Sequence, residues 1–279
     1  MLLVGNKKSV SICVIRGEIH LRLCESIKEG DCEAERTEKG ILLFFPLFPS
    51  FPFVEIHSYF MNDLSQSIEV WNVFLPAVCA DADSCRSFLA DGELERAAKF
   101  KNAGDAERFV LGRGLLRKIL ADYLNIAPAA VMLSRTPEGK PVLANGGLDF
   151  NVSHSRDRML IAVTAGRAVG VDIEFRRDKL SMNDIVDRWF APAEREFFRR
   201  SPADCFFELW AKKEAYAKAR GTGIFQELKN VSVPVGEPPF APAVDASGKW
   251  FFQMLNIDPE YAAAVVSVAP PVPVLLRSL

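Results

Sequence analysis

The chain has 279 residues, a formal net charge of −2 and 49% hydrophobic residues. This length allows a large core in one domain or two small ones, and the near-neutral charge gives no reason to expect a nucleic-acid partner. Six cysteines without a C-x-x-C pair, and only three histidines, argue against zinc sites and a disulfide framework. We therefore expect a cytoplasmic protein of a reducing compartment.

The first sixty residues differ from the rest. Charged clusters precede the apolar run I-L-L-F-F-P-L-F-P-S-F-P-F-V at 41–54. This run is about fourteen residues long, short of the roughly twenty that span a membrane, and its three prolines would disrupt a helix. It also starts too late for a signal peptide. We expect residues 1–60 to be a disordered extension, or an upstream stretch included by a wrong start codon, without membrane contact.

Residues 61–166 are expected to form a first α/β half. A strand at 68–75 leads through a loop into two helices, and turn signals then separate further strands. Gly112 and Gly114 lie inside the second helix rather than after a strand, so they are expected to allow close packing and not to bind phosphate. The helices are expected near 92–101 and 104–124, and the strands near 140–144, 148–152 and 158–164.

Residues 167–269 are expected to form a second half of similar plan, followed by a Pro-rich tail at 270–279. Its helices are expected near 182–188, 192–200 and 204–220, and its strands near 168–174, 229–233, 249–255 and 261–268.

Two acidic residues lie on the predicted strand G-V-D-I-E at 170–174. Side chains alternate along a strand, so Val171 and Ile173 should face the core while Asp172 and Glu174 share the opposite face. A pair of carboxylates on one face can hold a cation.

A third acid, Glu214, lies within the predicted helix at 204–220, which Asp204 could cap and Gly221 could end. Trp210, Glu214 and Lys218 are four residues apart and share one stripe of that helix. Magnesium prefers carboxylate oxygens together with water and substrate phosphate. The three acids and the neighbouring basic residues therefore indicate a magnesium-bound phosphate substrate, with Trp210 expected to orient the helix by packing.

Three motifs in this order resemble a known family: F-N-V-S-H-S at 150–155, G-V-D-I-E at 170–174 and W-A-K-K-E-A-Y-A-K at 210–218. They resemble the 4′-phosphopantetheinyl transferases, specifically the pseudodimeric type that activates peptide synthetases such as surfactin synthetase. The similarity runs from about Ile68 to about Val268 and includes K-F-x-x-x-x-D-A-E-R-F-x-x-G-R at 99–113 and G-K-P at 139–141. It implies an α/β (α+β) fold of two similar halves related by a pseudo-twofold axis, with the active site between them.

The resemblance also implies a reaction. A monomeric enzyme would transfer 4′-phosphopantetheine from coenzyme A, its co-substrate, to a serine of an apo acyl or peptidyl carrier protein, releasing adenosine 3′,5′-bisphosphate. Asp172, Glu174 and Glu214 would hold Mg²⁺, with Mn²⁺ as a possible substitute, and Lys218 would pair with the pyrophosphate. Two candidates remain for the group that accepts the serine proton: Glu214 and a metal-bound water held by Glu174.

For the nucleotide end, the resemblance implies contacts from Arg96, Lys140, Ser153 and His154, with Arg96 and His154 near the 3′-phosphate. An arginine suits that position because its planar fork engages phosphate oxygens in pairs. This chain departs from the family at two positions. Glu93 stands where a second basic residue is common, and Phe109 stands where a small hydroxyl residue can occur.

Two other functions remain open: a coenzyme A or carrier-binding module without catalysis, and a metal-dependent phosphohydrolase. The role of Lys213 is undecided, and Arg113 and Arg117 are expected to form an i,i+4 basic stripe. Aromatic residues at Trp189, Phe190, Phe197 and Phe198 could dock a carrier helix, although helix-spaced aromatics more often belong to a core.

Overall fold

The computed structural model describes residues 2–5, 8–15, 18–24, 64–177, 182–200, 204–221, 231–235, 240–245, 248–268 and 270–279. Met1–Phe51 and Pro52–Leu279 form two separate units. In the first unit, an antiparallel sheet in the order β1-β2-β3 contains Leu2–Gly5 (β1), Lys8–Ile15 (β2) and Glu18–Cys24 (β3).

This sheet differs from the disorder expected over residues 1–60. The apolar run at 41–54 lies outside the described residues. A start codon downstream of Met1 stays a prediction. Among the described residues, no helix combines the length and apolar character that crossing a membrane requires.

Pro52–Leu279 contains two larger sheets. We call them the first sheet and the second sheet, after the half of the chain that supplies most of the strands of each. The first sheet has the order β13-β4-β8-β7 among the described residues, antiparallel except that β13 runs parallel to β4. Its strands are Ile68–Phe74 (β4), Asp149–Ser155 (β7), Arg158–Thr164 (β8) and Val274–Ser278 (β13).

The second sheet is antiparallel throughout, in the order β10-β11-β12-β9 among the described residues. Its strands are Val169–Phe175 (β9), Phe240–Asp245 (β10), Gly248–Leu255 (β11) and Tyr261–Val268 (β12). A small separate pair joins Leu133–Arg135 (β5) to Pro141–Leu143 (β6).

The helices have local reasons for their ends. The Asn102 side chain accepts a hydrogen bond from the Gly104 amide at 2.8 Å and so caps α4, and Asn125 ends that helix in the left-handed conformation. Gly221 adopts φ 71° directly after α7. The helices are Ala82–Ser87 (α2), Asp91–Ala98 (α3), Ala103–Leu124 (α4), Met182–Trp189 (α5), Pro192–Arg200 (α6) and Asp204–Arg220 (α7), with short 3₁₀ turns at Leu75–Asp81 (η1) and Pro128–Ala130 (η2).

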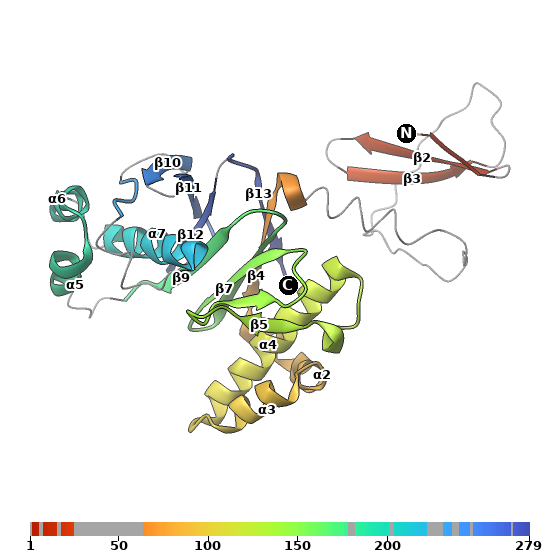
Figure 1. Cartoon of the computed structure of the whole chain (residues 1–279), viewed down its shortest axis with the longest axis horizontal. Helices are drawn as coiled ribbons and strands as arrows, with labels where there is room; N and C mark the ends of the chain where they lie inside the picture. Colours follow the sequence, from red (N-terminus) through yellow and green to blue (C-terminus); the bar gives the residue numbers. More distant parts are fainter. Residues whose placement is uncertain are drawn as a thin grey trace. The chain divides into compact units, whose positions relative to one another are not determined.

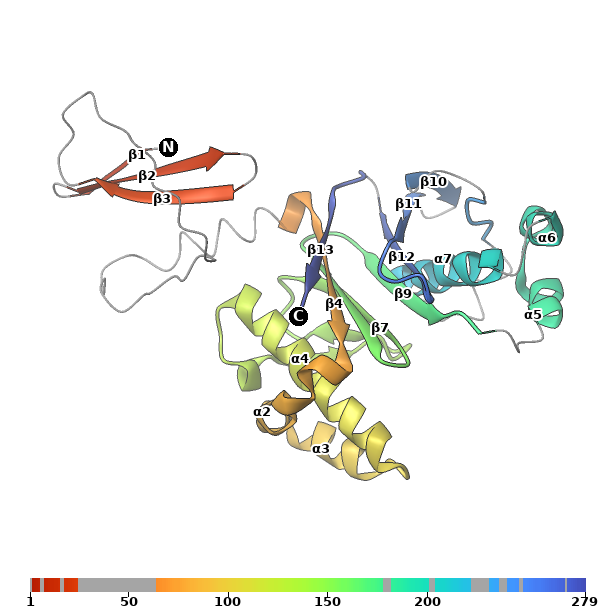
Figure 2. The ribbon, with the colours of Figure 1, turned by 180° about the vertical axis from the view of Figure 1, so that it is seen from behind.

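The layers of the two halves correspond. Buried residues of α4 pack on one face of the first sheet, and buried residues of α7 pack on one face of the second sheet. The opposite faces of the two sheets share one core, to which β4, β8, β9 and β12 contribute. The long helices therefore lie outside and the sheets inside (Figures 1 and 2). This arrangement confirms the α/β fold of two similar halves.

Two glycines allow the helices to approach their neighbours. A Cβ atom added to Gly114 of α4 would lie 2.4 Å from the Cβ of Cys85 in α2. A Cβ added to Gly170 of β9 would lie 2.0 Å from the carbonyl oxygen of Ala215 in α7. The close packing predicted for Gly114 is confirmed, and Gly170 brings β9 directly against α7.

Several segments differ from the sequence prediction, and β5 is a strand that it did not include. The expected loop after β4 contains η1 and α2. Described residues 231–235 do not form the strand expected at 229–233, and β10 was not predicted. The expected tail contains β13, which pairs with β4 in the first sheet. Its Val-Leu-Leu-Arg-Ser sequence is too short to carry a clear strand pattern, and its pairing partner lies some two hundred residues away in the chain.

Candidate active site

The acidic residues of β9 face α7. Asp172 and Glu174 lie opposite Ala264 and Ala262 of β12, so small side chains flank the acids on the same face of the sheet. Val171 and Ile173 point the other way, into the core between the two sheets. The alternation predicted from G-V-D-I-E is therefore present.

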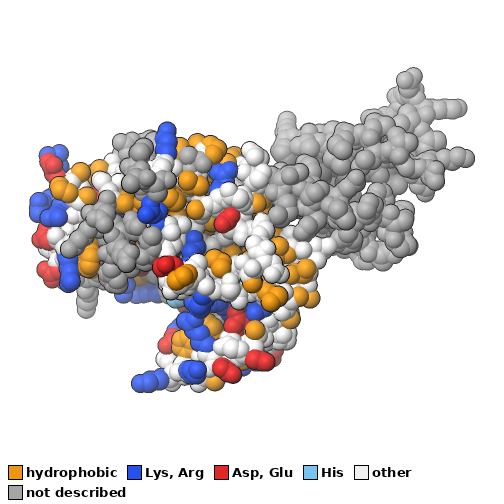
Figure 3. Space-filling model, in the orientation of Figure 1, with side chains coloured by type: hydrophobic (Ala, Val, Ile, Leu, Met, Phe, Trp, Pro, Cys, Tyr) orange, Lys and Arg blue, Asp and Glu red, His pale blue; other side chains and the backbone are white. Residues whose placement is uncertain are grey.

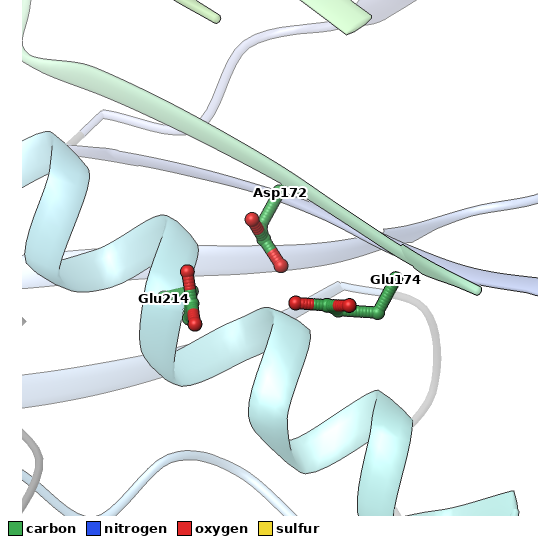
Figure 4. Close-up of side chains that lie close together, drawn as sticks. All are labelled: Asp172, Glu174 and Glu214. Atoms are coloured by element: carbon green, nitrogen blue, oxygen red, sulfur yellow. The ribbon is translucent and has the colours of Figure 1, made fainter. Parts of the chain in front are cut away.

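Glu214 of α7 completes a cluster of three carboxylates. One oxygen of each of Asp172, Glu174 and Glu214 lies within 4.8 Å of the others (Figure 4). Asp172 is 1% exposed, and the side chain of Glu214 is 18% exposed. Three acids drawn from two elements thus meet in a largely buried space.

Burial and mutual repulsion change the acidity of this cluster. Burial, followed by the charge of Asp172, raises the pKa of Glu214 to about 8 and the pKa of Glu174 to about 7. Lys218 and a hydrogen bond from the Trp210 side chain act on both glutamates in the opposite direction. A dense group of negative charge here favours a bound proton or a bound cation.

Lys218 is the cation of the cluster. Its Nζ lies 2.6 Å from Oδ1 of Asp172 and 3.9 Å from Oε2 of Glu214. It also donates to the Ser153 hydroxyl at 2.8 Å, while that hydroxyl donates to Oδ1 of Asp172 at 2.8 Å. The hydroxyl, the ammonium and the carboxylate form a closed hydrogen-bonded group.

Alternate side chains of β7 join the edges of the two sheets. The Asn151 side chain accepts from the Val171 amide at 2.9 Å, and the Ser155 hydroxyl accepts from the Phe175 amide at 3.0 Å. Ser153 lies between them, 3.4 Å from the Ile173 amide. These side chains satisfy amides on the edge of β9, so the motif at 150–155 connects the halves as well as entering the site.

The donor set fits a hard divalent cation. All three acids offer oxygen ligands, which magnesium prefers. In the described part of the chain, Oδ2 of Asp172 is buried and has no hydrogen-bond partner. A buried carboxylate oxygen without a partner is costly, and coordination would satisfy it.

Two other residues of the α7 motif have packing roles. Trp210 stacks near Phe190 and Phe206, with ring centroids 6.5 Å and 5.9 Å away. Lys213 points away from the acids and forms a buried 2.9 Å ion pair with Glu194 of α6. Lys213 therefore belongs to the core under α7, and Trp210 both packs and hydrogen-bonds to the acids.

The residues predicted for the nucleotide end have different surroundings. Ser153 is in the acidic site, but His154 is exposed because its side chain alternates away from Ser153 on β7. Arg96 is exposed on α3, with its guanidinium 5.1 Å from the centre of the Phe109 ring. The Nζ of Lys140 donates to backbone carbonyls of Lys218 and Val169.

Both departures from the family pattern have structural partners. Glu93 pairs with Arg113 at 3.3 Å and with Arg117 at 2.8 Å. Arg113 and Arg96 both lie over the Phe109 ring. Burial lowers the pKa of Arg113, with Glu93 opposing that effect. Arg117 is buried and donates to the Val131 carbonyl at 2.8 Å, so this member of the expected basic stripe has a partner within the fold.

Basic side chains gather on the lobe formed by α2, α3 and α4, where it meets the rest of the molecule (Figure 3).

The expected docking aromatics are mainly core residues. Phe190 is 1% exposed, and Trp189, Phe197 and Phe198 pack against the same cluster.

Sequence reasoning missed the structural use of Asn151 and Ser155. Their signal was present, because polar residues at 151, 153 and 155 follow the two-residue period of a strand. It also missed the interaction between Lys140 and the end of α7, which no local pattern contains.

Comparisons with known proteins match both halves of the chain. Residues 168–266 match a model of the 4′-phosphopantetheinyl transferase superfamily, and residues 78–166 match a model named 4′-phosphopantetheinyl transferase, N-terminal. The 4′-phosphopantetheinyl transferase HetI of Nostoc sp. is 34% identical over 211 residues, which cover 72% of this chain and 88% of that protein.

Two further relatives cover a similar length. A phosphopantetheinyl transferase of Thraustochytrium sp. is 31% identical over 225 residues, covering 71% of this chain and 78% of the relative. A 4′-phosphopantetheinyl transferase of Bacillus subtilis is 26% identical over 212 residues, covering 73% and 93%. The chain therefore belongs to the 4′-phosphopantetheinyl transferase superfamily and is a transferase enzyme.

Proposed function

We propose that this protein transfers 4′-phosphopantetheine from coenzyme A to a serine of an apo acyl or peptidyl carrier protein, with release of adenosine 3′,5′-bisphosphate. This is holo-[acyl-carrier-protein] synthase chemistry. The observation that carries the proposal is the cluster of Asp172, Glu174 and Glu214 beside Lys218, in a chain of this family. The relatives' names support the transferred group.

Asp172, Glu174 and Glu214 would hold Mg²⁺, and Mn²⁺ could replace it because both accept oxygen ligands. When bound, the metal would supply charge stabilisation for the phosphate oxygens, worth several kcal/mol. Asp172 is buried and Glu174 and Glu214 are partly buried, which strengthens the charge interactions within the site relative to those in water.

A serine hydroxyl is a poor nucleophile until a base accepts its proton. Glu214 is a candidate, because its carboxylate lies in the acidic cluster beside Lys218. A water molecule held by Glu174 is the alternative. Lys218 would contribute positive charge toward the pyrophosphate, because its ammonium already lies within the acidic cluster.

For the nucleotide end, we propose that Arg96 and His154 contact the 3′-phosphate. Both side chains are exposed, and Phe109 holds the Arg96 guanidinium over its ring. The family resemblance also assigns Ser153 and Lys140 to the nucleotide. Ser153 would act from within the acidic site, whereas the contacts of Lys140 with backbone carbonyls indicate a different role.

The test is transfer itself. Purified protein is incubated with coenzyme A, Mg²⁺ and a panel of apo carrier proteins, and each carrier is weighed by intact mass spectrometry. We expect a mass increase equal to one phosphopantetheine group, absent with a chelator and absent in Glu214→Gln. As a matched control, Glu95→Gln changes an exposed acid of α3 and should transfer normally.

Coenzyme A binding without modification of any carrier would contradict the proposal and favour an inactive binding module. Cleavage of coenzyme A without a modified carrier would favour a phosphohydrolase. Substantial turnover by Glu214→Gln at saturating Mg²⁺ would remove Glu214 from the catalytic residues.

A further inference from the structure

The side chain of Lys140 crosses from one half of the molecule to the other. Its backbone lies just before β6, in the first half, while its Nζ donates to the Lys218 carbonyl at 2.7 Å and to the Val169 carbonyl at 3.3 Å. These carbonyls belong to α7 and β9, the two elements that carry the three acids. One ammonium group thus holds together both sides of the metal site.

The base of this side chain is fixed by its own turn. The Lys140 amide donates to the Thr136 hydroxyl at 3.2 Å, and the Lys140 carbonyl accepts from the Thr136 amide at 2.9 Å. Gly139 turns the chain with φ 89°, and its carbonyl accepts from Arg135 at 2.7 Å. Because the backbone of Lys140 is fixed by this turn, its side chain can hold the end of α7 in place instead of moving with it.

The far end meets α7 at a point where the helix needs a donor. Carbonyl groups in the last turn of a helix have no partner within it, and Lys218 lies in that turn. A lysine ammonium can satisfy such carbonyls and also complements the helix dipole. The aliphatic stem of Lys140 passes Gly221, where an added Cβ would lie 3.8 Å from its Cδ.

The carbonyl that Lys140 binds belongs to the same residue whose ammonium enters the site. The Nζ of Lys218 lies 2.6 Å from Asp172 and 2.8 Å from the Ser153 hydroxyl. We infer that Lys140 is a positioning residue that joins the halves and sets the placement of Lys218 over Asp172. This inference rests on the proposed function and replaces the nucleotide contact implied by the family resemblance.

The test separates positioning from binding. Lys140→Met keeps the length of the stem but removes its three donors, and Lys249→Met is the matched control because Lys249 is exposed on β11. Because small displacements of reacting groups are costly, we expect kcat of Lys140→Met to fall on the order of 10- to 100-fold. The Kd for coenzyme A, measured by calorimetry, should change less than about threefold, since positioning acts on the chemical step. Lys140→Arg keeps donors at this position and should recover part of kcat.

A second readout does not depend on activity. Hydrogen exchange of the peptide covering 215–221 should be faster in Lys140→Met than in the wild type and in Lys249→Met, because the last turn of α7 loses an anchor. This comparison remains valid if the wild type transfers nothing, so failure of the proposed function and failure of the inference are distinguishable.

A rise in the Kd for coenzyme A that exceeds the fall in kcat would overturn the inference, because Lys140 would then be a direct ligand. Unchanged kcat together with unchanged exchange would also overturn it. If Lys140→Met does not fold, the same comparison is made with Lys140→Arg, whose longer side chain should displace Lys218 and lower kcat without weakening coenzyme A binding.

Discussion

Glu214→Gln should stabilise the metal-free protein at alkaline pH while removing its response to Mg²⁺. Burial and the charge of Asp172 raise the pKa of Glu214 to about 8, from an ordinary value of 4.5. The folded protein therefore resists ionisation of this carboxyl group more than the unfolded chain does. The glutamine side chain has the same shape but carries no charge, so it removes this cost of ionisation in the folded protein.

The pH dependence follows from linkage. A carboxyl group whose pKa is raised in the folded state costs nothing below pH 4.5, and its cost grows as pH rises through about 8. Each pKa unit corresponds to about 1.4 kcal/mol, so this interval sets a ceiling of roughly 5 kcal/mol. The pKa of about 8 already includes the attraction of Lys218, and the amide leaves Asp172 and Glu174 facing each other. We expect a gain of about 1–2 kcal/mol above pH 8 and almost none near pH 4.5.

The assay is urea unfolding with chelator at pH 4.5 and pH 8.5, followed by thermal unfolding with increasing Mg²⁺. Wild-type protein should gain stability with Mg²⁺, because a ligand that binds the folded state stabilises it, whereas Glu214→Gln should respond far less. Glu95→Gln, an exposed change on α3, should match the wild type throughout. A metal-free Glu214→Gln protein that is no more stable than the wild type at pH 8.5 would refute the reasoning.

Two further predictions concern the packing of α7. Gly170→Ala should lower the free energy of unfolding by about 3 kcal/mol or more, because the new methyl group would overlap the Ala215 backbone. As a control in the same urea experiment, Gly92→Ala on α3 should leave the free energy of unfolding unchanged or raise it by up to ~1 kcal/mol. Lys213→Met should cost about 3–5 kcal/mol in the free energy of unfolding, because the buried Glu194 carboxylate keeps its bonds from the Ala191 and Val233 amides but loses its ion-pair partner. A loss below about 1 kcal/mol in the same urea experiment would contradict this.

The local geometry of the acids was accessible from the sequence. A two-residue period placed Asp172 and Glu174 on one face, and a four-residue spacing aligned Glu214 with Lys218. These rules depend only on neighbouring residues of one element. The meeting of β9 with α7 was inferred from family resemblance, because no local period shows which two elements pack together.

Contacts between distant segments were not accessible in the same way. Lys213 and Lys218 have the same residue type on the same helix, yet one pairs with Glu194 in the core and the other with Asp172 in the site. Their difference depends on which element covers each side of α7. The pairing of β13 with β4 and the reach of Lys140 to α7 also depend on tertiary structure.

The charge balance of the site links its stability to its proposed activity. Asp172, Glu174 and Glu214 would carry three negative charges when ionised, against positive charge from Lys218 within the cluster and from Arg177 near Glu174, so a divalent cation would offset the remaining negative charge. Without a cation, protonation of the glutamates relieves the same excess, and burial together with the charge of Asp172 raises their pKa values to about 7 for Glu174 and about 8 for Glu214. Metal binding must then displace protons, so affinity for Mg²⁺ should rise between pH 6 and pH 8. The repulsion that destabilises the metal-free fold is therefore the same interaction that favours the metal, and a variant cannot remove the first without weakening the second.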